Sequence, residues 1–113
     1  MGQSALRGPR TEPPQSATMP RVSRDVIRRH LLVHGKVQGV FFRDSTRESA
    51  ENESVSGWAA NRDDRSVEVV LEGPPDAVEA VIGFCRMGPM SADVSSVDVT
   101  EEEPEWLSGF ETR

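Results

Sequence analysis

The segment from Gly35 to Arg43 carries residue types that can bind an anion. Its sequence is Gly-Lys-Val-Gln-Gly-Val-Phe-Phe-Arg, and it lies between a predicted strand and a predicted helix. Two glycines four residues apart allow a short loop to curl until successive backbone N–H groups converge. The helix adds the positive end of its dipole, and Arg43 in its first turn can bind a tetrahedral oxyanion through two hydrogen bonds. By spacing alone, the same residues also fit an ordinary strand-to-helix turn with a surface arginine.

The charge distribution limits the kinds of partner. The chain has 113 residues and a formal net charge of −6, and six arginines lie within residues 1–29, so the remainder is strongly acidic. An acidic body is a poor match for nucleic acid, which requires clustered Lys and Arg, and no aromatic stacking platform is apparent. An anionic substrate therefore needs a strong local site, and segment 35–43 reverses the charge locally.

Length and composition predict one domain in a reducing compartment. Domains usually hold about 100–150 residues, so a second core is excluded. Cys85 is the single cysteine and permits neither an internal disulfide nor a cysteine zinc cluster. No stretch approaches the ~20 apolar residues that cross a bilayer, and no secretory signal is evident. We therefore expect a cytoplasmic protein with no membrane partner.

Two parts of the chain differ in composition. Residues 1–24 combine four prolines with Gly, Ser, Thr, Gln and Arg and have almost no apolar periodicity, which predicts a flexible or disordered tail. Met19 lies just before the structured part and is an alternative start of the native protein. Residues 25–113 are predicted to form the folded domain.

Hydrophobic periodicity in the domain predicts alternating strands and helices. The expected elements are a strand at 26–33, a loop at 35–40, a helix at 42–53, a hairpin of strands 55–61 and 67–72, a helix from Pro74 or Pro75 to Gly88, a strand at 94–99 with an irregularity at Ser95-Ser96, and a short strand at 110–113. The order β-α-β-β-α-β predicts an α+β fold, a ferredoxin-like α/β sandwich with both helices on one face of an antiparallel sheet.

The literal residues are more specific than their spacing. The segment 35–43 resembles the first signature of the acylphosphatase family, and Gly-Trp-Ala-Ala-Asn at 57–61, followed by Val67 and Gly73, resembles the second. Both signatures occur in order, and the resemblance covers about residues 26–113. It implies the sandwich fold and hydrolysis of the carboxyl–phosphate bond of small acyl phosphates, of acetyl, carbamoyl or bisphosphoglycerate type, with no metal and no other cofactor.

The resemblance also implies roles for individual residues. Arg43 becomes the phosphate-binding arginine, and Asn61 becomes the residue that orients the attacking water. The predicted phosphate-binding loop comprises Gly35, Lys36, Val37, Gln38, Gly39, Val40 and Phe41. The implied reaction is in-line attack of water on phosphorus with no phosphoenzyme, while a route in which the substrate itself acts as the base stays open.

The chain departs from the family at two turns. Ser54 stands where a glycine usually ends the first helix, and Arg65 stands where the second signature usually has a glycine. A non-glycine residue in a left-handed conformation costs on the order of 1 kcal/mol, so these changes predict lower stability or altered turns.

Other residues have structural explanations. We expect His34 to be non-catalytic, Cys85 to be a small core residue and Trp58 to pack on the sheet, and Lys36 either assists phosphate capture or is solvated.

Two rivals to a monomeric, standalone enzyme remain. One is a non-catalytic ferredoxin-like accessory or binding module. The other is the acylphosphatase-like domain of larger carbamoyl-transferring hydrogenase maturation proteins. We prefer the standalone enzyme because the chain lacks the length and the paired-cysteine zinc segments of the latter.

Overall fold

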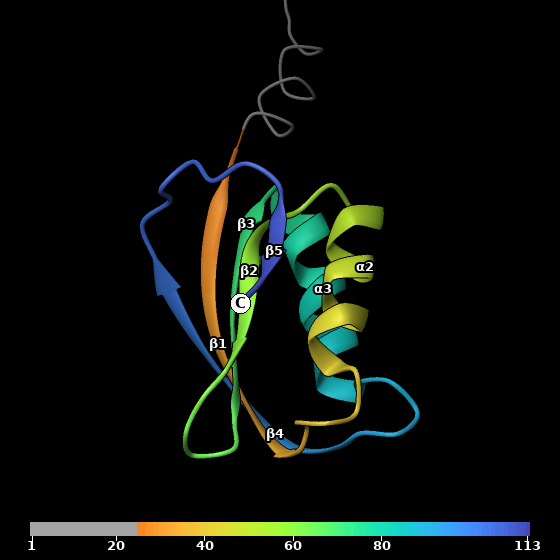
Figure 1. Cartoon of the computed structure of the whole chain (residues 1–113). Coiled ribbons are helices and arrows are strands. Elements are labelled where there is room, and N and C mark those ends of the chain that lie inside the picture. The colour runs from red at the N-terminus through yellow and green to blue at the C-terminus, as the bar shows by residue number, and fades with distance from the viewer. Residues whose placement is uncertain (1–24) are drawn as a thin grey trace, which may run out of the picture.

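The computed structural model describes residues 25–113, which form a sheet covered on one face by two helices (Figure 1). The predicted tail, residues 1–24, lies outside the described residues. The elements are β1 (Ile27–Lys36), α2 (Phe42–Asn52), β2 (Ser56–Asn61), β3 (Val67–Gly73), α3 (Pro75–Met87), β4 (Asp93–Glu102) and β5 (Phe110–Thr112). Within this part of the chain, neither helix is long and apolar enough to cross a membrane.

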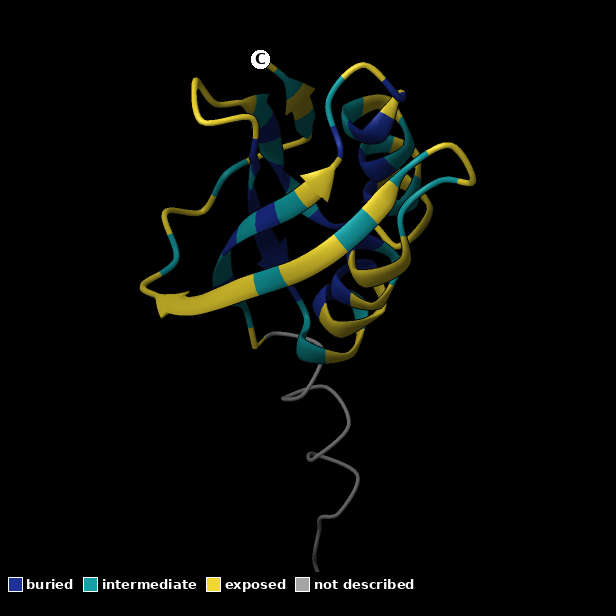
Figure 2. Cartoon of the chain, turned by 90° about the horizontal axis from the view of Figure 1, so that it is seen from below, coloured by how far each residue is buried: buried dark blue, intermediate teal, exposed yellow. Residues whose placement is uncertain are grey.

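The sheet has the strand order β4-β1-β3-β2-β5. The first four strands pair antiparallel, with Leu31 opposite Val69 and Val99, whereas β5 pairs parallel with β2. The predicted fold class is confirmed, and the short fifth strand makes the sheet mixed. Helix α3 packs over β4, β1 and β3, whereas α2 packs over β2 and β5. The exposed β4 forms an edge of the sheet (Figure 2).

The core follows from alternation on the strands and a four-residue repeat on the helices. Leu31 and Val33 of β1 are fully buried, and so are Val67, Val69 and Leu71 of β3. The predicted helical stripes face them: α2 contributes Phe42, Thr46 and Ala50, and α3 contributes Val78, Val81, Ile82 and Cys85. Burial of these apolar surfaces is the main source of stability.

The two residues that replace the family's usual glycines have a left-handed backbone conformation. Ser54 has φ 59° and lies just after the end of α2, where the N–H of Val55 still donates to Ala50 O at 2.8 Å. Arg65 has φ 79° in the β2–β3 turn. Both turns therefore keep a geometry that favours glycine, in which a non-glycine residue costs on the order of 1 kcal/mol.

The first strand is longer than its apolar run indicates. We expected Gly35 and Lys36 in a loop, but both belong to β1 and pair with Val94 and Asp93 of β4. A Cβ at Gly35 would lie 2.2 Å from Asp93 O, so this glycine is required for the close approach of β4. The pairing shifts register between His34 and Gly35, which confirms the predicted irregularity around Ser95.

A buried ion pair joins the sheet to the connection between β4 and β5. Arg28 Nη1 lies 2.9 Å from Glu72 Oε2 and Arg28 Nε lies 2.7 Å from Glu102 Oε1. The main-chain N–H groups of Glu105 and Leu107 donate to the Glu72 carboxylate. Burial by itself would raise the pKa of Glu72, but these two N–H groups and Arg28 lower it below the ordinary value of a glutamate. Glu72 thus holds this connection across the end of the sheet where β1 begins (Figure 1).

Candidate active site

The loop after β1 presents a row of main-chain N–H groups. Gly39 and Phe41 have left-handed φ values of 74° and 61°, and Phe41 is the N-cap of α2. Among the described residues, the N–H groups of residues 38–43 have no hydrogen-bond acceptor. Left-handed residues alternating with others turn successive N–H groups toward one point, which is the geometry of an anion-binding nest. The positive end of the α2 dipole lies beside it.

Gln38 joins this loop to the β2–β3 hairpin. Its Nε2 donates to Arg62 O at 2.8 Å and to Ser66 O at 2.9 Å. The hairpin turn is itself closed, because the N–H of Arg62 donates to Ser66 O at 2.9 Å and Asp64 Oδ1 accepts from the Ser66 N–H at 3.0 Å. The two hydrogen bonds from the Ser66 side chain and main chain lower the pKa of Asp64. Gln38 therefore fixes the position of the loop relative to the hairpin.

Arg43 lies in the first turn of α2 and is oriented by the chain that follows β5. Its Nη1 donates to the main-chain oxygen of Arg113 at 2.6 Å. The Arg113 N–H donates in turn to Ala59 O of β2 at 2.8 Å, and the Arg113 guanidinium lies 4.5 Å from the centre of the Trp58 ring. The parallel pairing of β5 with β2 thus brings an acceptor to Arg43.

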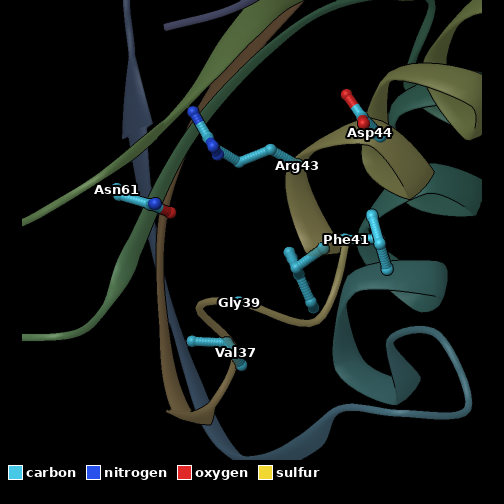
Figure 3. Close-up of a pocket in the computed structure, with 7 residues that line it drawn as sticks. Val37, Gly39, Phe41, Arg43, Asp44 and Asn61 are labelled. Carbon is cyan, nitrogen blue, oxygen red and sulfur yellow. The ribbon is translucent and has the colours of Figure 1, made fainter.

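Asn61 is the last residue of β2 and is exposed. Its side chain makes no hydrogen bond to another described residue. Figure 3 shows Asn61 and Arg43 extending toward each other from opposite elements, with the loop of Val37 and Gly39 beneath them. The amide can therefore reach a molecule held between the loop and the arginine.

These groups line one cavity of about 290 Å³. The residues around it are Val37, Gly39, Phe41, Phe42, Arg43, Asp44 and Asn61. Five of them belong to the predicted site, and the structure brings them together from β2, the loop and α2.

Four predicted loop residues do not line the cavity. Gly35 and Lys36 lie in β1, the side chain of Gln38 points to the hairpin, and Val40 is only 7% exposed in the core. Two residues that line the cavity were not predicted from the sequence: Phe42, which is buried, and Asp44, which is exposed. The signal available for Asp44 was its place next to Arg43 in the first helical turn.

The remaining candidates lie elsewhere. His34 contacts Asp98 at 3.1 Å on the sheet and does not line the cavity. Cys85 is fully buried, and burial raises the pKa of its thiol to about 12. Trp58 packs beneath Arg113. Among the described residues, no group of three or more His, Cys, Asp or Glu side chains is placed to hold a metal ion.

Comparison with known proteins agrees with this geometry. The family model for acylphosphatase matches residues 29–112. The chain belongs to the acylphosphatase family. It is 47% identical over 89 residues to an acylphosphatase of Natronomonas pharaonis, covering 79% of this chain and 97% of that protein. It is 51% identical over 85 residues to an acylphosphatase of Gloeobacter violaceus, covering 75% and 91%.

A solved structure supports the same assignment. The chain superposes on an acylphosphatase from Coxiella burnetii with a TM-score of 0.76 and 38% identity, covering 80% of this chain and 95% of that one. Membership of the acylphosphatase family supports acyl phosphate hydrolysis, as the two motifs predicted, and does not favour the non-catalytic module.

Proposed function

We propose that this chain hydrolyses the carboxyl–phosphate bond of small acyl phosphates by attack of water on phosphorus. The observation that carries the proposal is the cavity that the loop, Arg43 and Asn61 line together, where the loop N–H groups have no acceptor among the described residues (Figure 3). The N–H groups of residues 38–43 and the Arg43 guanidinium bind the phosphoryl oxygens. Phosphoryl transfer spreads negative charge over these oxygens, so fixed donors at this position stabilise the transition state.

Asn61 orients the nucleophile. Its Oδ1 accepts a hydrogen bond from the water, and its Nδ2 can donate to a phosphoryl oxygen. The water oxygen forms a bond to phosphorus as the bond to the acyl oxygen breaks, and the electron pair of that bond leaves on the carboxylate. A carboxylate is a good leaving group and requires no general acid. The water proton passes to solvent, or to a phosphoryl oxygen in the substrate-assisted route.

The protein is proposed to act as a cytoplasmic monomer with no metal, nucleic acid or membrane partner. A chelator in every assay tests the metal-free chemistry, because EDTA would abolish turnover by a metal-dependent enzyme. Sedimentation of the purified chain tests its oligomeric state, and a dimer would contradict the proposal.

The decisive experiment measures phosphate release from acetyl and benzoyl phosphate in the presence of EDTA. Arg43→Ala is expected to lose binding and turnover together, with kcat/KM falling by about 100-fold or more, because a charge-assisted bidentate contact is removed. Asn61→Ala is expected to lose about 100-fold in kcat while inorganic phosphate still inhibits it. Arg47→Ala is the matched control, since Arg47 lies one turn along α2 and does not line the cavity.

Two results would contradict the proposal. A fully active Asn61→Ala variant would exclude the water-orienting role, and an Arg47→Ala loss equal to that of Arg43→Ala would show a general charge effect. Inorganic phosphate should also raise the melting temperature of the wild type and not that of Arg43→Ala, because a ligand stabilises only the state that binds it.

A further inference from the structure

Asp44 places a carboxylate at the rim of the cavity that is proposed to bind the dianionic phosphoryl group. The side chain projects from the first turn of α2 and is 62% exposed. Its nearest cation outside the site is Arg47, at 4.0 Å from Oδ1, and the side chains of Arg47 and Asp44 are 41% and 62% exposed. Such a surface pair is weak, so Arg47 leaves most of the negative charge of Asp44 in place.

The reaction geometry determines which part of the substrate meets Asp44. In an in-line displacement, the leaving group departs from the side of phosphorus opposite the attacking water. Asn61 holds the water on the β2 side of the cavity, so the acyl group leaves toward α2. Figure 3 shows Asp44 and Phe41 on that side, across the cavity from Asn61.

The surface that receives the acyl group is apolar and acidic. Phe41 is 76% exposed and offers a phenyl face, while Asp44 supplies the negative charge beside it. Arg43 is the one cation among the residues that line the cavity, and the phosphoryl group and Arg113 O engage it. An acyl group with its own negative charge would therefore meet the charge of Asp44 and find no further cation among the residues that line the cavity.

We infer that Asp44 is a specificity-determining residue that makes the chain prefer acyl phosphates with an uncharged acyl group over those with an anionic one. Acetyl, carbamoyl and benzoyl phosphate belong to the favoured class, and dicarboxylic or phosphoglyceroyl phosphates belong to the disfavoured class. The inference rests on the proposed function, because it assumes hydrolysis of acyl phosphates in this cavity.

The size of the preference follows from electrostatics. Two charges about 8 Å apart at a solvated rim repel enough to change kcat/KM by between about threefold and thirtyfold, depending on the effective dielectric. Asp44 also repels the phosphoryl group of every substrate, but this effect is common to all of them. The ratio of kcat/KM between two substrates isolates the effect on the acyl group.

The test uses a pair of substrates that differ by one ring carboxylate, benzoyl phosphate and 4-carboxybenzoyl phosphate. The ratio of their kcat/KM values is measured for the wild type, Asp44→Asn and Glu48→Gln at low salt. Glu48→Gln is the matched control, because Glu48 is an exposed acid one turn along α2 and does not line the cavity. We expect Asp44→Asn to reduce the preference for benzoyl phosphate by about threefold to thirtyfold, and Glu48→Gln to leave it within twofold.

Salt supplies a second measurement on the unmodified protein. The screening length is about 10 Å at 0.1 M salt and about 3 Å at 1 M, so 1 M NaCl should bring the wild-type ratio close to that of Asp44→Asn. An unchanged ratio in Asp44→Asn, or an equal change in Glu48→Gln, would overturn the inference while leaving the proposed function intact. Failure to hydrolyse either substrate would refute the proposed function itself.

Discussion

The two hydrogen bonds from Gln38 to the hairpin are expected to position the phosphate loop relative to Asn61. We predict that Gln38→Ala lowers both stability and turnover, because the loop and the hairpin meet through this side chain. The residues it joins are far apart in sequence, so no local turn replaces the link.

The structure limits the loss of stability. Each hydrogen bond contributes about 0.5–1.5 kcal/mol. Neither carbonyl is left without a donor, because Arg62 O also accepts from the Arg65 N–H at 3.1 Å and Ser66 O accepts from the Arg62 N–H at 2.9 Å. The free energy of unfolding should therefore fall by about 1–2 kcal/mol, equivalent to a decrease of about 5–15 °C in melting temperature for a domain of this size.

The loss of turnover has a different origin. A displacement of about 1 Å at a reacting centre can cost about 100-fold, so we expect kcat to fall by tenfold to 100-fold. If this loss acts through Asn61, adding Gln38→Ala to Asn61→Ala should reduce kcat by less than threefold, since residues that act as a unit are not additive. Urea unfolding and kinetics with benzoyl phosphate measure the two effects.

Ser91 offers a comparison on the same loop. Its Oγ donates to Val40 O at 3.1 Å, so Ser91→Ala removes one loop hydrogen bond without breaking the link to the hairpin. Ser91→Ala should lower stability by about 1 kcal/mol and change kcat by less than threefold. Equal kinetic losses in Ser91→Ala and Gln38→Ala, or full additivity of Gln38→Ala with Asn61→Ala, would refute the reasoning.

Three further outcomes are expected. Ser54→Gly and Arg65→Gly should each raise the free energy of unfolding by about 0.5–1 kcal/mol, measured by urea titration, because relief of the left-handed strain exceeds the added entropy of the unfolded chain. Destabilisation by both substitutions would show that the turns carry no strain. The pKa of Glu72 is lowered in the fold, so its contribution to stability is present at neutral pH and is lost as the pH falls through about 4.5 and below. The difference in unfolding free energy between pH 7 and pH 3 should therefore be larger in the wild type than in Glu72→Gln. Equal differences would contradict the role of the ion pair with Arg28. Cys85 should not react with a thiol reagent at pH 8 until urea unfolds the chain, because burial keeps its thiol protonated and inaccessible, and fast reaction of the native protein would contradict this.

Local sequence patterns determined the order of the secondary-structure elements, the family and the geometry of two turns. Alternation along the strands and the four-residue repeat on the helices specify the β-α-β-β-α-β order, because side chains must alternate across a sheet and recur on one helix face. The two motifs at 35–43 and 57–61 specify the family and place Arg43 and Asn61 at the ends of adjacent elements. Ser54 and Arg65 were predicted at turns that favour glycine, since turn geometry depends on a few neighbouring residues, and both have left-handed φ values.

Contacts between distant parts of the chain were decided only by the tertiary structure. Gly35 looked like part of a loop, yet the approach of β4 extends β1 through it, because pairing depends on a partner strand nearly sixty residues away. Gln38 contacts a hairpin 24 residues ahead, and Arg43 meets the main-chain oxygen of Arg113 across 70 residues. Periodicity and motif spacing carry no information about such pairs, since each depends on how whole elements pack in space.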